Sequence, residues 1–254
     1  MLLASESFAV FPAVRFITTV LSDVIGRRET GKTTLAVYLA RLSAHRAMFD
    51  PRNGIAGGAA ALKVTSHAEF RHAAMPALRA GAINEVIYSP FDNDLDGAFL
   101  VFGVQIKKWV REQPGRALSV VIDESFLVKE ELDRRAHPIK SAMRWCARDR
   151  VHFFLTCHRP GEVPTGVRAV SDYWLLFQCR QEQDLDVIAK RCGVNVANEV
   201  HTLKPYEFVI WDDTKAKLRR SSLKPADWHI DLHAPAAAAT AGITIPLDSG
   251  NLWL

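Results

Sequence analysis

The chain has 254 residues, of which 48% are hydrophobic and 24% are charged, a balance typical of one large globular domain with a full core. Its formal net charge is +4, a mildly basic character that permits a polyanionic partner without requiring one. No stretch reaches the roughly 18 consecutive apolar residues that a membrane span needs, so the composition excludes a membrane-spanning chain.

The cysteines and the first 21 residues of the chain indicate the cellular compartment in which the protein is expected. The four cysteines form no Cys-x-x-Cys pair, which argues against a zinc site and against a disulfide framework; they are Cys146, Cys157, Cys179 and Cys192. The first 21 residues mix Glu6, Pro12 and Arg15 into apolar positions and lack the basic-then-apolar order of a secretory signal. We therefore expect reduced thiols in a protein that stays in the cytoplasm where it is made.

Apolar strands and amphipathic helices alternate along most of the chain. The predicted strands are 18–25, 47–49, 85–88, 118–122, 151–156 and 173–178. The predicted helices are 32–47, 67–79, 97–112, 126–148 with an interruption at Pro138, and 184–192. Such alternation predicts an α/β fold in which helices cover both faces of a mostly parallel sheet.

The C-terminal part follows a different pattern. Residues 207–211 and 217–221 read as two strands that turn at 212–214, which predicts an antiparallel pair at one edge of the sheet. From His233 onward the chain contains an Ala-Pro-Ala-Ala-Ala-Ala run and little patterning. We expect one domain over residues 1–232 and a tail over 233–254.

A phosphate-binding motif follows the first predicted strand and opens the first predicted helix. Residues 26–33 read Gly-Arg-Arg-Glu-Thr-Gly-Lys-Thr and match GxxxxGK[ST] without a mismatch. The glycines let successive backbone N–H groups point at phosphates, and the helix N-terminus adds its dipole. We expect Lys32 to reach the β- and γ-phosphates and the Thr33 hydroxyl to ligate Mg²⁺. The predicted ATP-binding residues are Gly26, Arg27, Arg28, Glu29, Thr30, Gly31, Lys32, Thr33 and Thr34.

Two carboxylates end the apolar strand predicted at 118–122. Asp123 and Glu124 look like the Walker B motif of the additional-strand, catalytic-glutamate (ASCE) P-loop NTPases. Asp123 would hold the hydration shell of Mg²⁺, and Glu124 would orient and deprotonate the attacking water. Acidic pairs also serve as ordinary helix caps, but a position downstream of a P-loop favours the catalytic interpretation. The motifs together predict an ATP hydrolase.

Three further segments of the sequence indicate which family of ATPases the chain resembles. Residues 153–160, Phe-Phe-Leu-Thr-Cys-His-Arg-Pro, resemble the strand of the FtsK/HerA DNA-pumping ATPases that ends in a Thr-Gln-Arg-Pro-like run. Met48-Phe49-Asp50-Pro51 and the run over 172–177 are similar to two other strands of that family. The order of motifs agrees from about residue 20 to residue 211. In its small size the chain most resembles the genome-packaging ATPases of tailless, membrane-containing icosahedral phages.

The resemblance implies a function and partners. It implies a translocase that pumps double-stranded DNA without reading its sequence, assembled as a homo-oligomeric ring with a hexamer as the expected size. It implies packaging of a viral genome into a preformed capsid, with a capsid vertex or membrane protein as a partner. The expected location is the host cytoplasm, and association with the virion is the second expected location.

Two residues are assigned by the resemblance alone. His158 stands where the family usually has Gln, and a neutral imidazole there could hydrogen-bond the γ-phosphate or the attacking water. A histidine at a strand end also commonly makes only a local hydrogen bond. Arg148 best matches the family's arginine finger, which enters a neighbour's site, and Arg150 is the adjacent candidate. A solvated or DNA-facing arginine is the alternative.

Basic residues gather in three places that could contact DNA. One group is Lys107, Lys108 and Arg111; the second is Arg134, Arg135, Lys140 and Arg144; the third is Lys215, Lys217, Arg219 and Arg220. Phosphate contacts need such charge but read no sequence. Most basic clusters are merely solvated surfaces, and the sequence leaves open which one faces DNA.

Two other functions stay open at this point. A morphogenesis or secretion ATPase similar to the zonula occludens toxin-like proteins of filamentous phages is one, although those typically carry a transmembrane segment. A nucleotide-gated interaction protein that switches without pumping is the other. The Asp123-Glu124 pair argues against a switch, because a switch does not need a strong catalytic base.

Overall fold

The computed structural model describes residues 21–58, 60–90, 94–134, 137–145 and 151–223. The tail expected at 233–254 and the two finger candidates, Arg148 and Arg150, lie outside these residues, as does the predicted domain boundary at 232. Within the described part of the chain, no helix combines the length and the apolar composition needed to cross a membrane.

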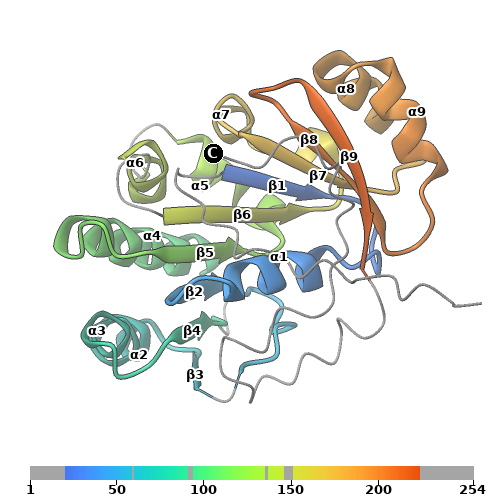
Figure 1. Ribbon diagram of the computed structural model, residues 1–254. Helices are drawn as coiled ribbons and strands as arrows, with labels where there is room; N and C mark the ends of the chain where they lie inside the picture. The colour runs from blue at the N-terminus through green and yellow to red at the C-terminus, as the bar shows by residue number, and fades with distance from the viewer. Residues whose placement is uncertain (1–20, 59, 91–93, 135–136, 146–150, 224–254) are drawn as a thin grey trace, which may run out of the picture.

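One nine-stranded sheet organises the molecule (Figure 1). The strands are β1 (Leu21–Ile25), β2 (Arg46–Phe49), β3 (Ala61–Val64), β4 (Glu85–Tyr88), β5 (Leu118–Ile122), β6 (Val151–Cys157), β7 (Tyr173–Phe177), β8 (Glu207–Asp212) and β9 (Lys217–Ser222). Their spatial order is β3-β4-β2-β5-β6-β1-β7-β8-β9. The strands from β3 to β7 in this order pair in parallel, and β8 and β9 pair antiparallel. The predicted mixed sheet is confirmed.

The position of β6 decides where the motifs meet. β6 lies between β1 and β5, with Ile25 opposite Cys157 and Ile122 opposite Leu155. This is the additional strand that the acidic motif led us to expect. Because parallel strands end at the same edge of a sheet, the segments that follow β1, β5 and β6 emerge side by side.

Helices cover both faces of the sheet. α1 (Lys32–Arg41) packs on one face, where Leu35, Ala36 and Ala40 are buried against alternate strand residues such as Val24, Val121 and Phe154. The other face carries a larger apolar cluster, to which most of the remaining helices contribute. The helical segments other than α1 are α2 (His67–Glu69), η1 (Phe70–Ala74), α3 (Met75–Ala80), α4 (Leu95–Glu112), η2 (Ser125–Val128), α5 (Lys129–Asp133), α6 (Pro138–Trp145), η4 (Pro160–Glu162), α7 (Thr165–Arg168), α8 (Glu182–Cys192) and α9 (Val194–Thr202).

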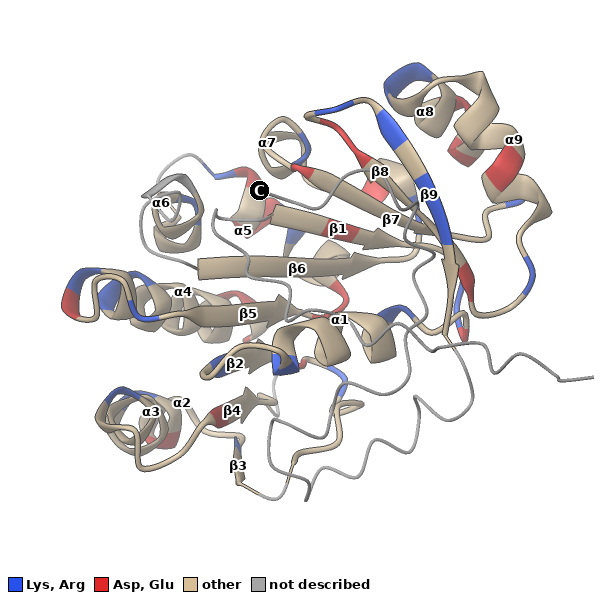
Figure 2. Ribbon diagram, in the orientation of Figure 1, with Lys and Arg blue, Asp and Glu red and all other residues tan. Residues whose placement is uncertain are grey.

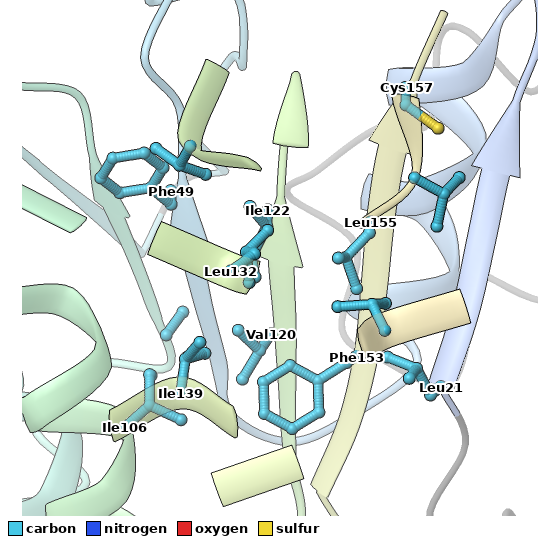
Figure 3. Packing of buried hydrophobic residues seen from close by; sticks show 14 of the residues in the cluster. Leu21, Phe49, Ile106, Val120, Ile122, Leu132, Ile139, Phe153, Leu155 and Cys157 are labelled. Atoms are coloured by element: carbon cyan, nitrogen blue, oxygen red, sulfur yellow. The ribbon is translucent and has the colours of Figure 1, made fainter. Parts of the chain in front are cut away.

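The larger cluster packs the central strands against these helices. Figure 3 shows Val120, Ile122, Phe153 and Leu155 on one face of β5 and β6, with Leu132 close by. Their neighbours Val121 and Phe154 belong to the cluster on the α1 face, as the alternation of a strand requires. All residues of β1, β5 and β6 are buried, so the strands that precede the motifs form a rigid support.

Several element boundaries differ from the sequence predictions. The helix predicted over 32–47 ends at Arg41, because Arg46 begins a strand and its side chain pairs with the buried carboxylate of Glu85 at 3.3 Å. The interruption predicted at Pro138 is confirmed, because α5 ends at Asp133 and α6 begins at Pro138, a first helical position at which proline is tolerated. Strand β3 and helix α9 were not predicted.

Candidate nucleotide-binding site

The P-loop links β1 to α1 by way of two glycines that have little room for a side chain. Gly26 lies against β7, where a Cβ on it would come within 2.5 Å of the Phe177 Cβ. Its N–H donates to the carbonyl of Cys157 at 3.3 Å. Gly31 has a left-handed φ of 98°, and a Cβ there would come within 2.7 Å of Leu223 Cδ1. Both positions therefore require glycine in this conformation.

Lys32 lies inside the loop. Its ammonium donates to the Arg27 carbonyl at 2.7 Å, and the Thr30 hydroxyl donates to the same oxygen at 2.8 Å. The residue is only 6% exposed. Burial lowers the pKa of Lys32, and the negative charges of Asp123 and Glu124 are among those that oppose this shift. A buried cation within a glycine-flanked loop fits a phosphate ligand.

Asp123 joins the P-loop to the acidic motif. Its Oδ1 accepts hydrogen bonds from the Thr33 hydroxyl at 2.9 Å and from the Thr156 hydroxyl at 2.6 Å. Burial raises the pKa of Asp123, and the two threonine hydrogen bonds oppose that shift. Thr33 and Asp123, predicted from separate motifs to serve Mg²⁺, are therefore in contact. Hydroxyl and carboxylate oxygens are the ligands that Mg²⁺ prefers, so this pair fits the ion.

Glu124 has an unusual backbone conformation. Its φ of 51° and ψ of 45° are left-handed, which is uncommon for a residue other than glycine. The Glu124 N–H donates to the Thr156 hydroxyl at 2.9 Å, so this one hydroxyl contacts both acidic residues. The Glu124 carboxylate has two basic neighbours at its Oε2: the His158 imidazole at 3.0 Å and the Arg52 guanidinium at 3.3 Å.

The segment after β6 is tied down on both sides of His158. The Glu162 carboxylate accepts the His158 N–H at 3.1 Å and the Arg159 N–H at 3.0 Å. Arg159 in turn donates to Asp184 of α8 at 3.1 Å. The His158 ring also lies 5.1 Å from the ring of Phe126, centre to centre. These contacts hold the imidazole beside Glu124.

Sequence reasoning missed three residues of this site. Arg52, Thr156 and Asp50 were not assigned a role, although Asp50 directly follows a buried strand, a signal that could have marked it. Asp50 is fully buried and accepts the Ile55 N–H at 2.8 Å, which shapes the turn carrying Arg52. No local pattern marks Arg52, because its contact with Glu124 joins two loops that follow β2 and β5.

The structure thus brings together most of the predicted site residues. The P-loop from Gly26 to Thr33, the pair Asp123 and Glu124, and His158 meet at the carboxyl edge of the sheet. The side chains of Arg27, Arg28, Glu29 and Thr34 are exposed at its rim. Arg148 and Arg150 lie outside the described residues, so their assignment remains a prediction.

The fold matches solved structures, although the sequence matches no family model and no curated protein. The genome-packaging NTPase B204 of Sulfolobus turreted icosahedral virus 2, in complex with ATP-gammaS, superposes with a TM-score of 0.62 and 17% identity over 80% of this chain and 96% of that one. B204 of Sulfolobus turreted icosahedral virus, described as a DNA-packaging ATPase, gives 0.57 and 18% over 79% and 96%. VirB4 of Thermoanaerobacter pseudethanolicus gives 0.55 and 10% over 83% and 91%. The additional-strand P-loop NTPase fold is confirmed.

Proposed function

We propose that this protein is an ATP hydrolase of the FtsK/HerA type that translocates double-stranded DNA and packages a viral genome into a preformed capsid. The observation that carries the enzymatic part is the contact network from Thr33 through Asp123 and Thr156 to Glu124 and His158. It joins segments that follow three different strands, as a shared reaction site requires. The likeness in fold to the genome-packaging NTPase B204 supports the packaging part.

Each residue of the network has a role in the proposed hydrolysis. The P-loop amides and Lys32 hold the phosphates, and Thr33 and Asp123 hold Mg²⁺, which when bound would supply positive charge to the phosphate oxygens. Glu124 orients the attacking water and accepts its proton. His158 positions the Glu124 carboxylate by donating its Nε2–H to Oε2.

The proposed active unit is a ring, hexameric by resemblance, with ATP between neighbouring subunits. In this proposal Arg148 completes a neighbour's site and neutralises charge that develops during phosphoryl transfer. Arg150 is the alternative donor of the same group. A ring also gives the translocase a channel through which the DNA would move.

The described surface favours one basic group for contact with DNA. Lys107 and Arg111 of α4 are exposed and form no ion pair with the described residues, whereas Arg220 of β9 pairs with Glu199 and Glu207. Lys140 of the second group is buried. Figure 2 shows basic residues on both α4 and β9. We therefore propose Lys107 and Arg111 as the first residues to test for backbone contact.

The test of the translocase is phosphate release with and without long double-stranded DNA, at low and at moderate salt. We expect stimulation that is equal for unrelated sequences and that vanishes as salt is added, because each neutralised phosphate releases a counterion. Lys107→Ala combined with Arg111→Ala should reduce the stimulation and leave the rate without DNA unchanged. The exposed pair Lys215→Ala and Lys217→Ala is the matched comparison.

The proposal that this protein is a DNA translocase would be abandoned if assembled rings hydrolyse ATP equally fast with and without DNA and bind no DNA at low salt. Only the proposal that the protein hydrolyses ATP would then be kept. The packaging part has its own test, which is nuclease protection of DNA inside capsids in the presence of ATP. Protection that is the same with Lys32→Ala protein would exclude a packaging role.

A further inference from the structure

We propose that the base of the β8–β9 pair holds the P-loop in its phosphate-binding conformation. Tyr206 directly precedes β8 and Leu223 directly follows β9, and both side chains lie against Gly31 of the loop. In this proposal the two are positioning residues, which act through Gly31 and touch no part of the ligand. The inference rests on the proposed function, because the loop that they hold is the proposed phosphate site.

Gly31 is enclosed on the side where a side chain would project. A Cβ on it would lie 2.7 Å from Leu223 Cδ1 and 3.2 Å from Tyr206 Cδ1. Leu223 is only 4% exposed, and both residues pack in the apolar cluster that also contains Leu35 of α1. Figure 1 shows the end of β9 close to the first turn of α1. The C-terminal strand pair, far away in sequence, therefore packs on the P-loop itself.

The two side chains are held together by the strand pair. The Leu223 N–H donates to the Tyr206 carbonyl at 2.9 Å, one step beyond the last residue pair of the two strands. The Glu207 carboxylate accepts the Lys204 N–H at 2.8 Å and pairs with Arg220 of β9 at 2.7 Å. These contacts fix the turn that carries Tyr206, so the strand pair presents both side chains to the loop as one unit.

Tyr206 has a backbone conformation that is costly for its side chain. Its φ is 66°, in the left-handed region that a bulky residue rarely adopts. Such residues persist where surrounding contacts hold them, and they cluster at ligand clamps and switch regions. Glycine would adopt this conformation without the cost. The tyrosine at this position therefore points to a role for its ring, and the ring lies over Gly31.

Gly31 is the residue through which this contact reaches the phosphates. It is the N-cap of α1, and its carbonyl accepts the Leu35 N–H at 2.9 Å. Its position therefore sets the direction of Lys32 and of the N–H groups in the first turn of the helix, which are free to bind an anion. A loop that is held in advance loses less entropy when the anion binds, so removing either side chain should weaken phosphate binding.

The experiment measures the binding of a non-hydrolysable ATP analogue and of inorganic tripolyphosphate, which carries the phosphates without the nucleoside. Calorimetry is done on the full chain with Tyr206→Leu, Leu223→Ala and Tyr206→Phe. We expect the first two variants to bind both ligands about fivefold more weakly, because the loop is no longer held. Tyr206→Phe keeps the ring and should bind both ligands as the native protein does. Leu218→Ala, at a 37% exposed residue of the same strand β9, is the matched control and should change neither affinity.

The outcomes separate this inference from the proposed function. Lys32→Ala should weaken both ligands, and if neither ligand binds the native protein, the proposed function fails and this inference fails with it. The inference alone is overturned if Tyr206→Leu binds both ligands as tightly as the native protein. It is also overturned if the variants weaken only the ATP analogue, which would place the ring on the nucleoside, or if Leu218→Ala has the same effect. Tyr206→Leu keeps an apolar side chain in the cluster, so it decides the test if Leu223→Ala does not fold.

Discussion

The imidazole Nε2 of His158 lies 3.0 Å from the Glu124 carboxylate oxygen Oε2, so the histidine that follows β6 touches the acid that follows β5. At the position where the FtsK/HerA ATPases that the sequence resembles usually have Gln, the histidine reaches the proposed catalytic carboxylate. The same oxygen lies 3.3 Å from the Arg52 guanidinium. Glu124 is therefore held between His158 and Arg52.

Glu124→Gln should keep ATP bound and slow hydrolysis by at least about a hundredfold, because the amide preserves the geometry but cannot accept a proton. Nucleotide binding and single-turnover phosphate release measure the two effects separately. Glu130→Gln, at an exposed residue of α5, is the matched control and should behave as the native protein. Full turnover by Glu124→Gln would remove the catalytic assignment.

His158→Gln should retain most of the turnover, since its amide can still donate a hydrogen bond to the Glu124 carboxylate. His158→Ala should lower the turnover by about tenfold or more, because the carboxylate loses one of its two positioning contacts. Steady-state rates at saturating ATP test both. Equal rates for the alanine variant and the native protein would show that the histidine makes only a local contact.

Thr156→Val should lower turnover and raise the Mg²⁺ concentration needed for half-maximal activity. The threonine hydroxyl donates to Asp123 and accepts from the Glu124 N–H. Valine keeps the shape but leaves the Glu124 N–H unpaired and removes one of the two hydrogen bonds to Asp123. Thr156→Ser should restore the native Mg²⁺ dependence. An unchanged Mg²⁺ titration for the valine variant would contradict the proposed role of this hydroxyl.

Arg148→Ala subunits and Lys32→Ala subunits should each be inactive alone and should regain partial activity when mixed. Some interfaces of a mixed ring then pair an intact P-loop with an intact finger. Phosphate release after subunit exchange is the measurement, with exchange verified by a fluorescent label. No recovery in rings that do exchange would count against Arg148, and recovery with Arg150→Ala in its place would move the role there.

Asp23 provides a prediction about stability. This residue of β1 is fully buried, and burial raises its pKa from 3.8 to about 6, opposed by the Ser171 hydroxyl and by Arg191 and Arg168. Since the raised pKa disfavours the carboxylate in the folded state, ionisation of Asp23 destabilises the fold. This cost is absent below pH 3.8, grows as the pH rises to about 6 and stays constant above.

Asp23→Asn should therefore gain stability relative to the native protein as the pH rises. The difference in free energy of unfolding should shift in favour of the variant by up to about 3 kcal/mol between about pH 4 and pH 7. Urea unfolding at several pH values measures it, with Asp186→Asn at an exposed position as the control. A difference that does not change with pH would show that Asp23 has an ordinary pKa in the folded protein.

The sequence by itself determined those features that depend on neighbouring residues. The P-loop match over 26–33 and the acidic pair after an apolar strand are local patterns, and so is the alternation that predicted most strands. Each requires only that certain residue types follow one another at short spacing. The α/β class, the additional-strand division and the antiparallel C-terminal pair were all correctly predicted in this way.

Tertiary structure alone decided which of these local features touch one another. The contact of Arg52 with Glu124 and the bridging hydroxyl of Thr156 both depend on the order in which strands pair. That order follows from the packing of two helix-covered faces over long sequence separations, which short-range patterns do not encode. For the same reason the helix predicted to reach residue 47 ends at Arg41: pairing of β2 with β4 and β5 overrides the local helical periodicity.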